Sequence, residues 1–250
     1  MCCFSGHVDR VADTHIFARS AGNGRQLLVY AMTIATKNDV AMILPLPVPP
    51  SPPEDAVRFI DLKDYPDFFK DLKLGFPEPV SRGLVGAKSE APRPMAAAPL
   101  KVVEVGSFEA SFVPTVKDFG RLDARFRLPD KTWESLPAYK DYGFAVFKLK
   151  KEASTVHPMA FDFPRADPAK VFFPTIHIHD GKAHATADFD HALYAQGRDG
   201  ETHDFMSWQE SFAPAGRFMD MRRAKGVVDA ERHVHLKRMA GRRKNEDVLV

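Results

Sequence analysis

The chain has 250 residues, of which 44% are hydrophobic and 27% are charged, proportions that are ordinary for a globular protein. Its formal net charge of +2 creates no overall field that would favour nucleic acid as a partner. No apolar run approaches the ~20 residues that a membrane span needs, and the N-terminus lacks the charged and apolar segments of a secretory signal.

Short strands separated by turn residues dominate the first part of the chain. Alternating or apolar runs predict strands at 14–19, 26–34 and 40–48. Ser51-Pro52-Pro53-Glu54 matches a capping box and predicts the start of a helix. A further helical turn or two is expected over 67–74.

Residues 77–99 are rich in Pro, Ala and Ser and are expected to form a flexible loop. The later pattern predicts strands at 100–105, 108–113, 142–149, 157–163 and 231–239, and helices at 115–126 and 129–136. Residues 241–250 are expected to be a basic tail. Because strands and helices do not alternate in βαβ order, we expect one globular domain over 1–250. Its predicted class is α+β, β-rich, with a mainly antiparallel sheet and a few short helices.

The segment Val171–His191 contains Asp180-Gly181 between two alternating runs, a pattern that predicts a β-hairpin with a two-residue turn. In that register His177 faces His184, and His179 shares their side because side chains alternate along a strand. Three imidazoles that converge from two strands are the protein part of an open metal site. A one-residue slip would move His184 to the opposite face, which would leave a solvated, His-rich hairpin.

The three predicted imidazole ligands suit zinc, iron or copper and leave a position for water or oxygen. A His-x-His strand beside a third His resembles the arrangement in carbonic anhydrases and cupins, although the glycine-rich cupin motif is absent. Asp188, Asp190 and His191 are expected to orient the ligands, and a polar strand end is the alternative. The main functional hypothesis is a metal-dependent hydrolase or oxidoreductase.

The end of the chain is strongly cationic and contains a second His-x-His, His233-Val234-His235. Positive charge disfavours a metal cation there. The segment could instead hold an anion or an RNA backbone, or be a solvated basic tail.

Cys2 and Cys3 are the only cysteines, so we expect no disulfide framework and a reducing, cytoplasmic location. If Met1 is removed, the free α-amine of Cys2 can act as the base for its own thiol. Cys2 followed by Arg19 resembles the spacing in N-terminal-nucleophile hydrolases, including bile-acid amidases. That resemblance implies Cys2 and Arg19 as catalytic residues of an amidohydrolase, although no Asn lies between Asn38 and Asn245 to stabilise an oxyanion.

A third hypothesis is a non-catalytic binding or structural module. The sequence does not identify the partner, which is expected to be a small molecule or a protein, with no membrane and no nucleic acid.

Overall fold

The computed structural model describes most of the chain and leaves several segments outside it. The described residues are 3–36, 39–77, 103–105, 108–128, 130–134, 136–149, 154–155, 158–178, 184–197 and 205–250. The predicted flexible loop lies outside them from residue 78 onward, so it stays a prediction. The described helices are all too short or too polar to span a bilayer.

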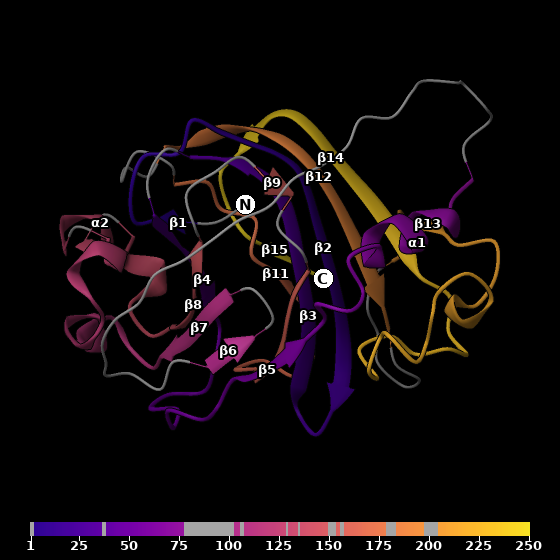
Figure 1. Cartoon of the computed structure of the whole chain (residues 1–250), viewed down its shortest axis with the longest axis horizontal. Helices are drawn as coiled ribbons and strands as arrows, with labels where there is room; N and C mark the ends of the chain where they lie inside the picture. Colours follow the sequence, from indigo (N-terminus) through magenta and orange to yellow (C-terminus); the bar gives the residue numbers. More distant parts are fainter. Residues whose placement is uncertain are drawn as a thin grey trace.

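Two sheets form the centre of the protein (Figure 1). The five-stranded sheet has the spatial order β1 (Cys3–Phe4), β4 (Val40–Leu46), β8 (Gly143–Leu149), β7 (Phe108–Val113) and β6 (Val103–Val105). The larger sheet has the order β13 (Gln209–Glu210), β14 (His235–Lys244), β12 (Thr186–Gln196), β2 (Arg10–Gly22), β3 (Arg25–Ala35), β10 (Met159–Pro164) and β5 (Arg58–Asp61), and β9 (Ser154–Thr155) pairs with β3. A separate pair joins β11 (Phe172–Phe173) to β15 (Val248–Leu249). Every pairing between these strands is antiparallel except that of β12 with β2, which confirms the β-rich, mainly antiparallel part of the prediction.

β3 shows why apolar runs become central strands here. The turn before it is tight, because Gly22, Asn23 and Gly24 all have positive φ, and β2 therefore pairs back onto β3. Successive side chains of β3 then enter two different cores, with Leu28 in one and Val29 in the other. A strand that is buried on both faces needs this continuous apolar run.

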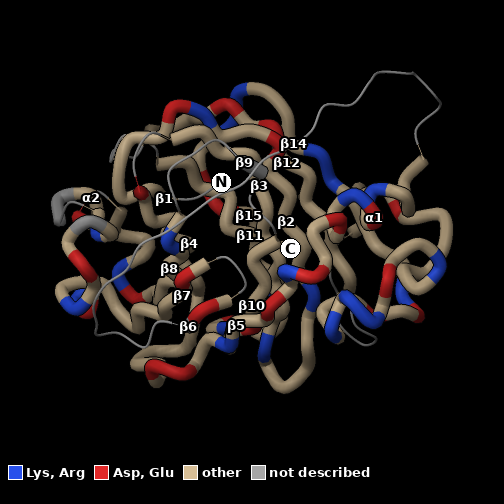
Figure 2. The backbone as a smooth tube through the Cα atoms, in the orientation of Figure 1, with Lys and Arg blue, Asp and Glu red and all other residues tan. Residues whose placement is uncertain are grey.

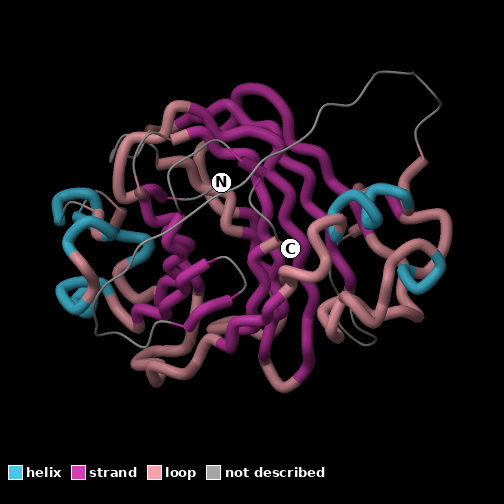
Figure 3. Tube along the Cα trace, in the orientation of Figure 1, coloured by secondary structure: helices cyan, strands magenta, loops and turns pink. Residues whose placement is uncertain are grey.

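Three apolar clusters separate the layers. The first lies between the sheets and includes Leu44 and Phe147 of one sheet and Leu28 of the other. The second lies on the other face of the large sheet, under α1 (Phe68–Leu74) and the segment 215–234. The third lies beneath the short helices that follow β7, which are η1 (Val116–Arg121), η2 (Ala124–Phe126), α2 (Asp130–Glu134) and η3 (Pro137–Tyr139). Helices therefore occupy two opposite ends, with strands between them (Figure 3).

The predicted hairpin over 171–191 is wrong in the described part of the chain. Phe172–Phe173 pairs with β15, and β12 pairs with β14 and β2 instead of folding back onto 171–178. Ile178 makes only an isolated bridge to Cys3. Residues 179–183, including the predicted turn and His179, lie outside the described residues.

The predicted helix start at Ser51 is also wrong. Ser51 has a φ of 52°, whereas an N-cap residue takes an extended conformation. The chain continues into β5, where Phe59 pairs with Phe161 and packs its ring edge-on against Phe147 at 5.5 Å. Burial of Phe59 between the sheets overrides the local capping signal.

The predicted basic tail is wrong as well. Residues 241–244 continue β14, which pairs with β12 through to Lys244, and the last residues form β15. Leu236 and Met239 of β14 are buried, so the strand is held by its few apolar side chains while its cations stay in water. Between β13 and β14 the chain forms one further short helix, η4 (Ala215–Arg217).

Candidate functional site

The side chain of Asn245 bonds to the backbones of His177 and His184, where the predicted hairpin would have paired the two residues directly. Its Oδ1 accepts the backbone N–H of His177 at 2.7 Å. Its Nδ2 donates to the carbonyl oxygens of both His177 and His184, at 2.9 and 3.0 Å. The backbones of the two histidines are therefore brought together, but by a side chain from the end of β14.

The imidazoles of the two residues have different surroundings. His177 is 6% exposed and packs against Phe189 and His191, with ring centroids 4.3 and 5.1 Å away. His191 is also buried and lies 5.0 Å from the Phe189 ring. His184 is exposed. His177 and His191 therefore contribute to the packing around Phe189, and His184 lies at the surface.

Asp188 and Asp190, which were predicted to orient the metal ligands, make other contacts. Asp190 accepts the backbone N–H of Asp13 at 2.9 Å, where β2 is irregular and Asp13 has a φ of 50°. Asp188 lies 3.4 Å from the guanidinium of Arg242, and both side chains are mostly exposed. Neither contact reaches an imidazole of the predicted metal site.

The metal-dependent function is therefore a wrong prediction. Among the residues that the structure describes, no three His, Cys, Asp or Glu side chains lie where they could hold a metal ion together. The physical reason is the register, because β12 pairs with β2 and β14 and turns His191 into the core. His179 lies outside the described residues.

Arg19 holds a loop instead of facing the N-terminus. Its guanidinium donates to the carbonyl oxygens of Val227 and Gly226, at 2.8 and 2.6 Å, and lies 4.0 Å from the Asp229 carboxylate. Cys3 is buried in the other sheet and forms no disulfide with a described residue, and Cys2 lies outside the described residues. The contacts of Arg19 join β2 to the loop at 226–229, and the catalytic pair Cys2 and Arg19 stays a prediction.

The sequence reasoning missed Asp247, which joins three segments. Its carboxylate accepts the backbone N–H groups of Thr175 and Ile176, at 2.8 and 3.0 Å, and the hydroxyl of Tyr139 at 2.7 Å. Burial of the carboxyl raises its pKa, although the residue as a whole keeps some exposure. No local pattern signals this role, because the partners are about 70 and 108 positions away in the sequence.

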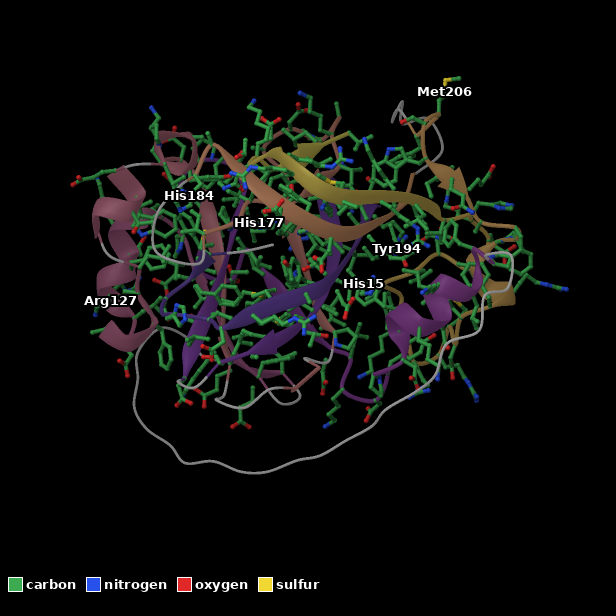
Figure 4. The ribbon with its side chains drawn as sticks, turned by 90° about the horizontal axis from the view of Figure 1, so that it is seen from above. His15, Arg127, His177, His184, Tyr194 and Met206 are labelled. Carbon is green, nitrogen blue, oxygen red and sulfur yellow. The ribbon has the colours of Figure 1, made fainter. Side chains whose placement is uncertain are left out.

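At the other end of the molecule, α1 packs on the large sheet through aromatic rings. His15 stacks on Phe69 at 5.3 Å, and Tyr194 lies 6.2 Å from His15 (Figure 4). Burial lowers the pKa of His15 and raises that of Tyr194 to about 12. Both side chains are therefore neutral near pH 7, as the apolar contact with α1 requires.

The outer side of this end carries the exposed apolar side chains Leu74 and Phe212 beside the partly buried Phe218, and we call these three residues the α1 patch. Leu74 ends α1 on the face opposite the core and is 58% exposed, and Phe212 is 64% exposed. The backbone N–H of Phe212 donates to the carbonyl of Gly75 at 3.0 Å, and its ring lies 5.9 Å from that of Phe218. The rings of Phe212 and Phe218 are thus neighbours, and the backbone of Phe212 is bonded to the residue that follows Leu74.

Backbone bonds fix Phe212 in this exposed position. Ser211 donates its hydroxyl to the carbonyl of Ala213 at 2.7 Å and accepts the N–H of Val234 at 3.0 Å. The backbone N–H of Ser211 also donates to the carbonyl of Val234, and that of Phe212 donates to the carbonyl of Gly75. These bonds hold the backbone in place, and the ring of Phe212 projects outward. Adjacent exposed aromatic and aliphatic side chains are typical of interaction sites.

Viewed over the whole molecule, neither sign of charge dominates. Basic and acidic positions of the described backbone are interspersed around the molecule (Figure 2), in keeping with the small net charge.

Comparison with known proteins adds a whole-chain similarity of fold. No family model matches the chain, and no curated protein matches it. The chain is similar to the crystal structure of baculovirus P35, with a TM-score of 0.52 and 15% identity over 99% of this chain and 98% of that chain. A caspase-8/P35 complex gives a TM-score of 0.46 at 15% identity, over 95% of each chain. A mutated baculovirus P35 after caspase cleavage gives 0.47 at 17% identity, over 96% of this chain and 97% of that chain. At this identity the similarity shows the fold alone.

Proposed function

We propose that this chain is a non-catalytic protein-binding module whose partner is a protease of the caspase class. The observation that carries the proposal is the fold similarity to baculovirus P35, which extends over nearly all of both chains. Fold alone does not specify function, so the proposal also needs a surface and a partner.

The partner class comes from what is recorded for P35 itself. P35 has been crystallised in a complex with caspase-8 and after caspase cleavage. A protein of this fold therefore binds a protease and is also its substrate. We transfer the binding, but not the site of cleavage, to this chain.

The α1 patch is the surface that we assign to the partner. Leu74 and Phe212 have most of their area in water, and Phe212 is bonded through its backbone to Gly75, next to Leu74. Burying such apolar side chains contributes about 25 cal/mol per Å². Buried aromatic and aliphatic anchors dominate the energy of most interfaces. The rigid backbone under Phe212 lowers the entropy that binding would cost.

A cytoplasmic location fits a sequence whose only two cysteines are neighbours, because such a chain has no separated cysteines to join in a disulfide. Caspase-class partners would be encountered there.

The test measures binding of the full chain to active caspase-8, and to a panel of other caspases, by surface plasmon resonance. We expect saturable binding that weakens by about tenfold or more in the double variant Leu74→Ser/Phe212→Ser. Leu249→Ser is the matched control, because Leu249 is a 50% exposed apolar residue away from the patch, and it should bind as the wild type does. Slower hydrolysis of a peptide substrate in the same mixtures would show that the bound protease is blocked.

Two outcomes would contradict different parts of the proposal. Absence of binding to every caspase tested would remove the partner class. Binding that is unchanged in the patch variant, with circular dichroism unchanged as well, would keep the partner and remove the α1 patch as its surface.

A further inference from the structure

β14 is an edge strand that is covered along only a small part of its outer side. On one side it pairs with β12 from His235 to Lys244. On the other side β13 pairs only with His235 and Leu236. Within the described chain no strand pairs with this outer side beyond Leu236.

The backbone geometry leaves this outer side able to accept another strand. Backbone groups point alternately to the two sides of a strand, so Ala240 faces the same outer side as Leu236. The carbonyl of Ala240 accepts a bond from an exposed side chain, the Nε of Arg243 at 3.1 Å. All residues from Ala240 to Lys244 are exposed, so no described layer covers either face of this stretch. Figure 1 shows β14 as the outermost ribbon of the sheet.

The charge of this edge is uniform. Between residues 237 and 244 there are five cations and no acidic residue, at positions Lys237, Arg238, Arg242, Arg243 and Lys244. Asp188 lies beside Arg242, and Glu246 lies beside Lys244, so the cations outnumber the carboxylates within the stretch itself. A strand with this composition attracts anions to both of its faces.

These cations select among the possible occupants. A second copy of this chain is disfavoured, because pairing edge to edge would bring the same cations opposite one another. A nucleic acid needs a positive stripe on one face. Here alternation places Lys237 and Arg243 on one face, and Arg238, Arg242 and Lys244 on the other. The cations on the two faces of β14 both lie next to its open edge, so a ligand that lies along this edge can contact both groups.

We propose that the open edge of β14, residues 237–244, adds an extended acidic peptide segment of a partner protein as a further strand of the sheet. Backbone hydrogen bonds to the outer side supply part of the affinity, and carboxylates on alternate faces of the peptide meet the arginines and lysines. This surface is separate from the α1 patch and does not depend on a protease partner.

The test uses a fluorescein-labelled eight-residue peptide in which pairs of Glu alternate with pairs of Val, so that an extended strand carries carboxylates on both faces, titrated with the full chain at low salt. We expect binding that is weakened about tenfold or more in Arg238→Glu/Arg242→Glu, because both charges are reversed next to the peptide. The control variant Lys70→Glu/Arg222→Glu removes two exposed cations elsewhere and should leave binding unchanged.

A second measurement needs no protein variant. The same peptide, N-methylated at every second residue, keeps its charges but loses the donors of one edge, and it should bind at least about tenfold more weakly to the wild-type chain. Equal binding of the methylated peptide, or equal binding of a single-stranded RNA of the same charge, would overturn strand addition in favour of simple electrostatic attraction. Absence of binding of the unmodified peptide at about 1 mM would overturn the proposal outright. Either result leaves the protease proposal unaffected, because that is tested at the α1 patch.

Discussion

β3 and β14 belong to the same sheet and have opposite surroundings. β3 is the strand between β2 and β10 and is buried over almost its whole length. β14 lies near the edge, and seven of its ten residues are exposed. The first strand therefore holds the two cores together, whereas most of the second is available for contacts outside the molecule. Immediately after β14 the chain again contributes to the fold, because the side chains of Asn245 and Asp247 accept hydrogen bonds from the backbone of segment 175–177.

The largest expected effect tests the central strand. Leu28→Ala in β3 removes a fully buried side chain from the core between the sheets. Such a truncation costs the transfer energy and leaves a cavity, about 2–5 kcal/mol together. Urea unfolding should show this loss, and Met206→Ala, at a side chain that is 97% exposed, should change stability by less than about 0.5 kcal/mol. A loss below about 1 kcal/mol for Leu28→Ala would mean that β3 is not the centre of the fold.

A smaller loss of stability is expected from a substitution at Asn245, which follows β14 directly. Asn245→Ala removes one acceptor and both donated bonds to the backbones of His177 and His184. Leaving such partly buried groups unpaired costs about 1–3 kcal/mol. The free energy of unfolding should fall by that amount. Hydrogen exchange at the amide of His177 should accelerate, and unchanged exchange there would contradict the role assigned to Asn245.

Strand existence could be predicted from the sequence, but strand partners could not. The runs at 26–34 and 142–149 are confirmed as β3 and β8, because a continuous apolar run between turn residues is a local signal. The Asp180-Gly181 signal is equally local, yet Phe172–Phe173 pairs with residues 248–249. The competing contact lies some 75 residues away, and no rule of spacing reveals it.

The candidate sites show the same limit. The three-histidine hypothesis depended on one register, and the actual register places His191 in the core and joins His177 to Asn245. Leu74 and Phe212 look like ordinary core residues in the sequence. Their exposure follows from packing of the opposite face of α1 and from the bonds around Ser211, so only the structure could locate the α1 patch.

A pH-dependent effect is expected at Asp247, just beyond β14. Burial raises the pKa of this carboxyl in the folded state above its unfolded value. Its contribution to stability is therefore present at low pH and is lost as the pH rises through the folded-state pKa. Asp247→Asn keeps an oxygen acceptor for the amides of Thr175 and Ile176 and carries no charge. Relative to this variant, the wild type should gain stability as the pH falls through the raised folded-state pKa of Asp247 toward its unfolded value. A difference in unfolding free energy that does not change with pH, or that changes in the opposite direction, would contradict the burial of the charge.

The smallest expected effect belongs to the exposed edge itself. Arg242→Ala removes the contact with Asp188, but the two side chains are 67% and 74% exposed, and such pairs contribute little in water. The free energy of unfolding should therefore change by less than about 0.5 kcal/mol, and added salt should make no difference to that result. The same substitution should still weaken binding of the acidic peptide, because a bound strand would lie beside the arginine and exclude part of its water. If Arg242→Ala instead destabilised the chain as strongly as Leu28→Ala, the cations of β14 would be part of the fold. The contrast between a central strand that holds the fold and an edge left open for a partner would then fail.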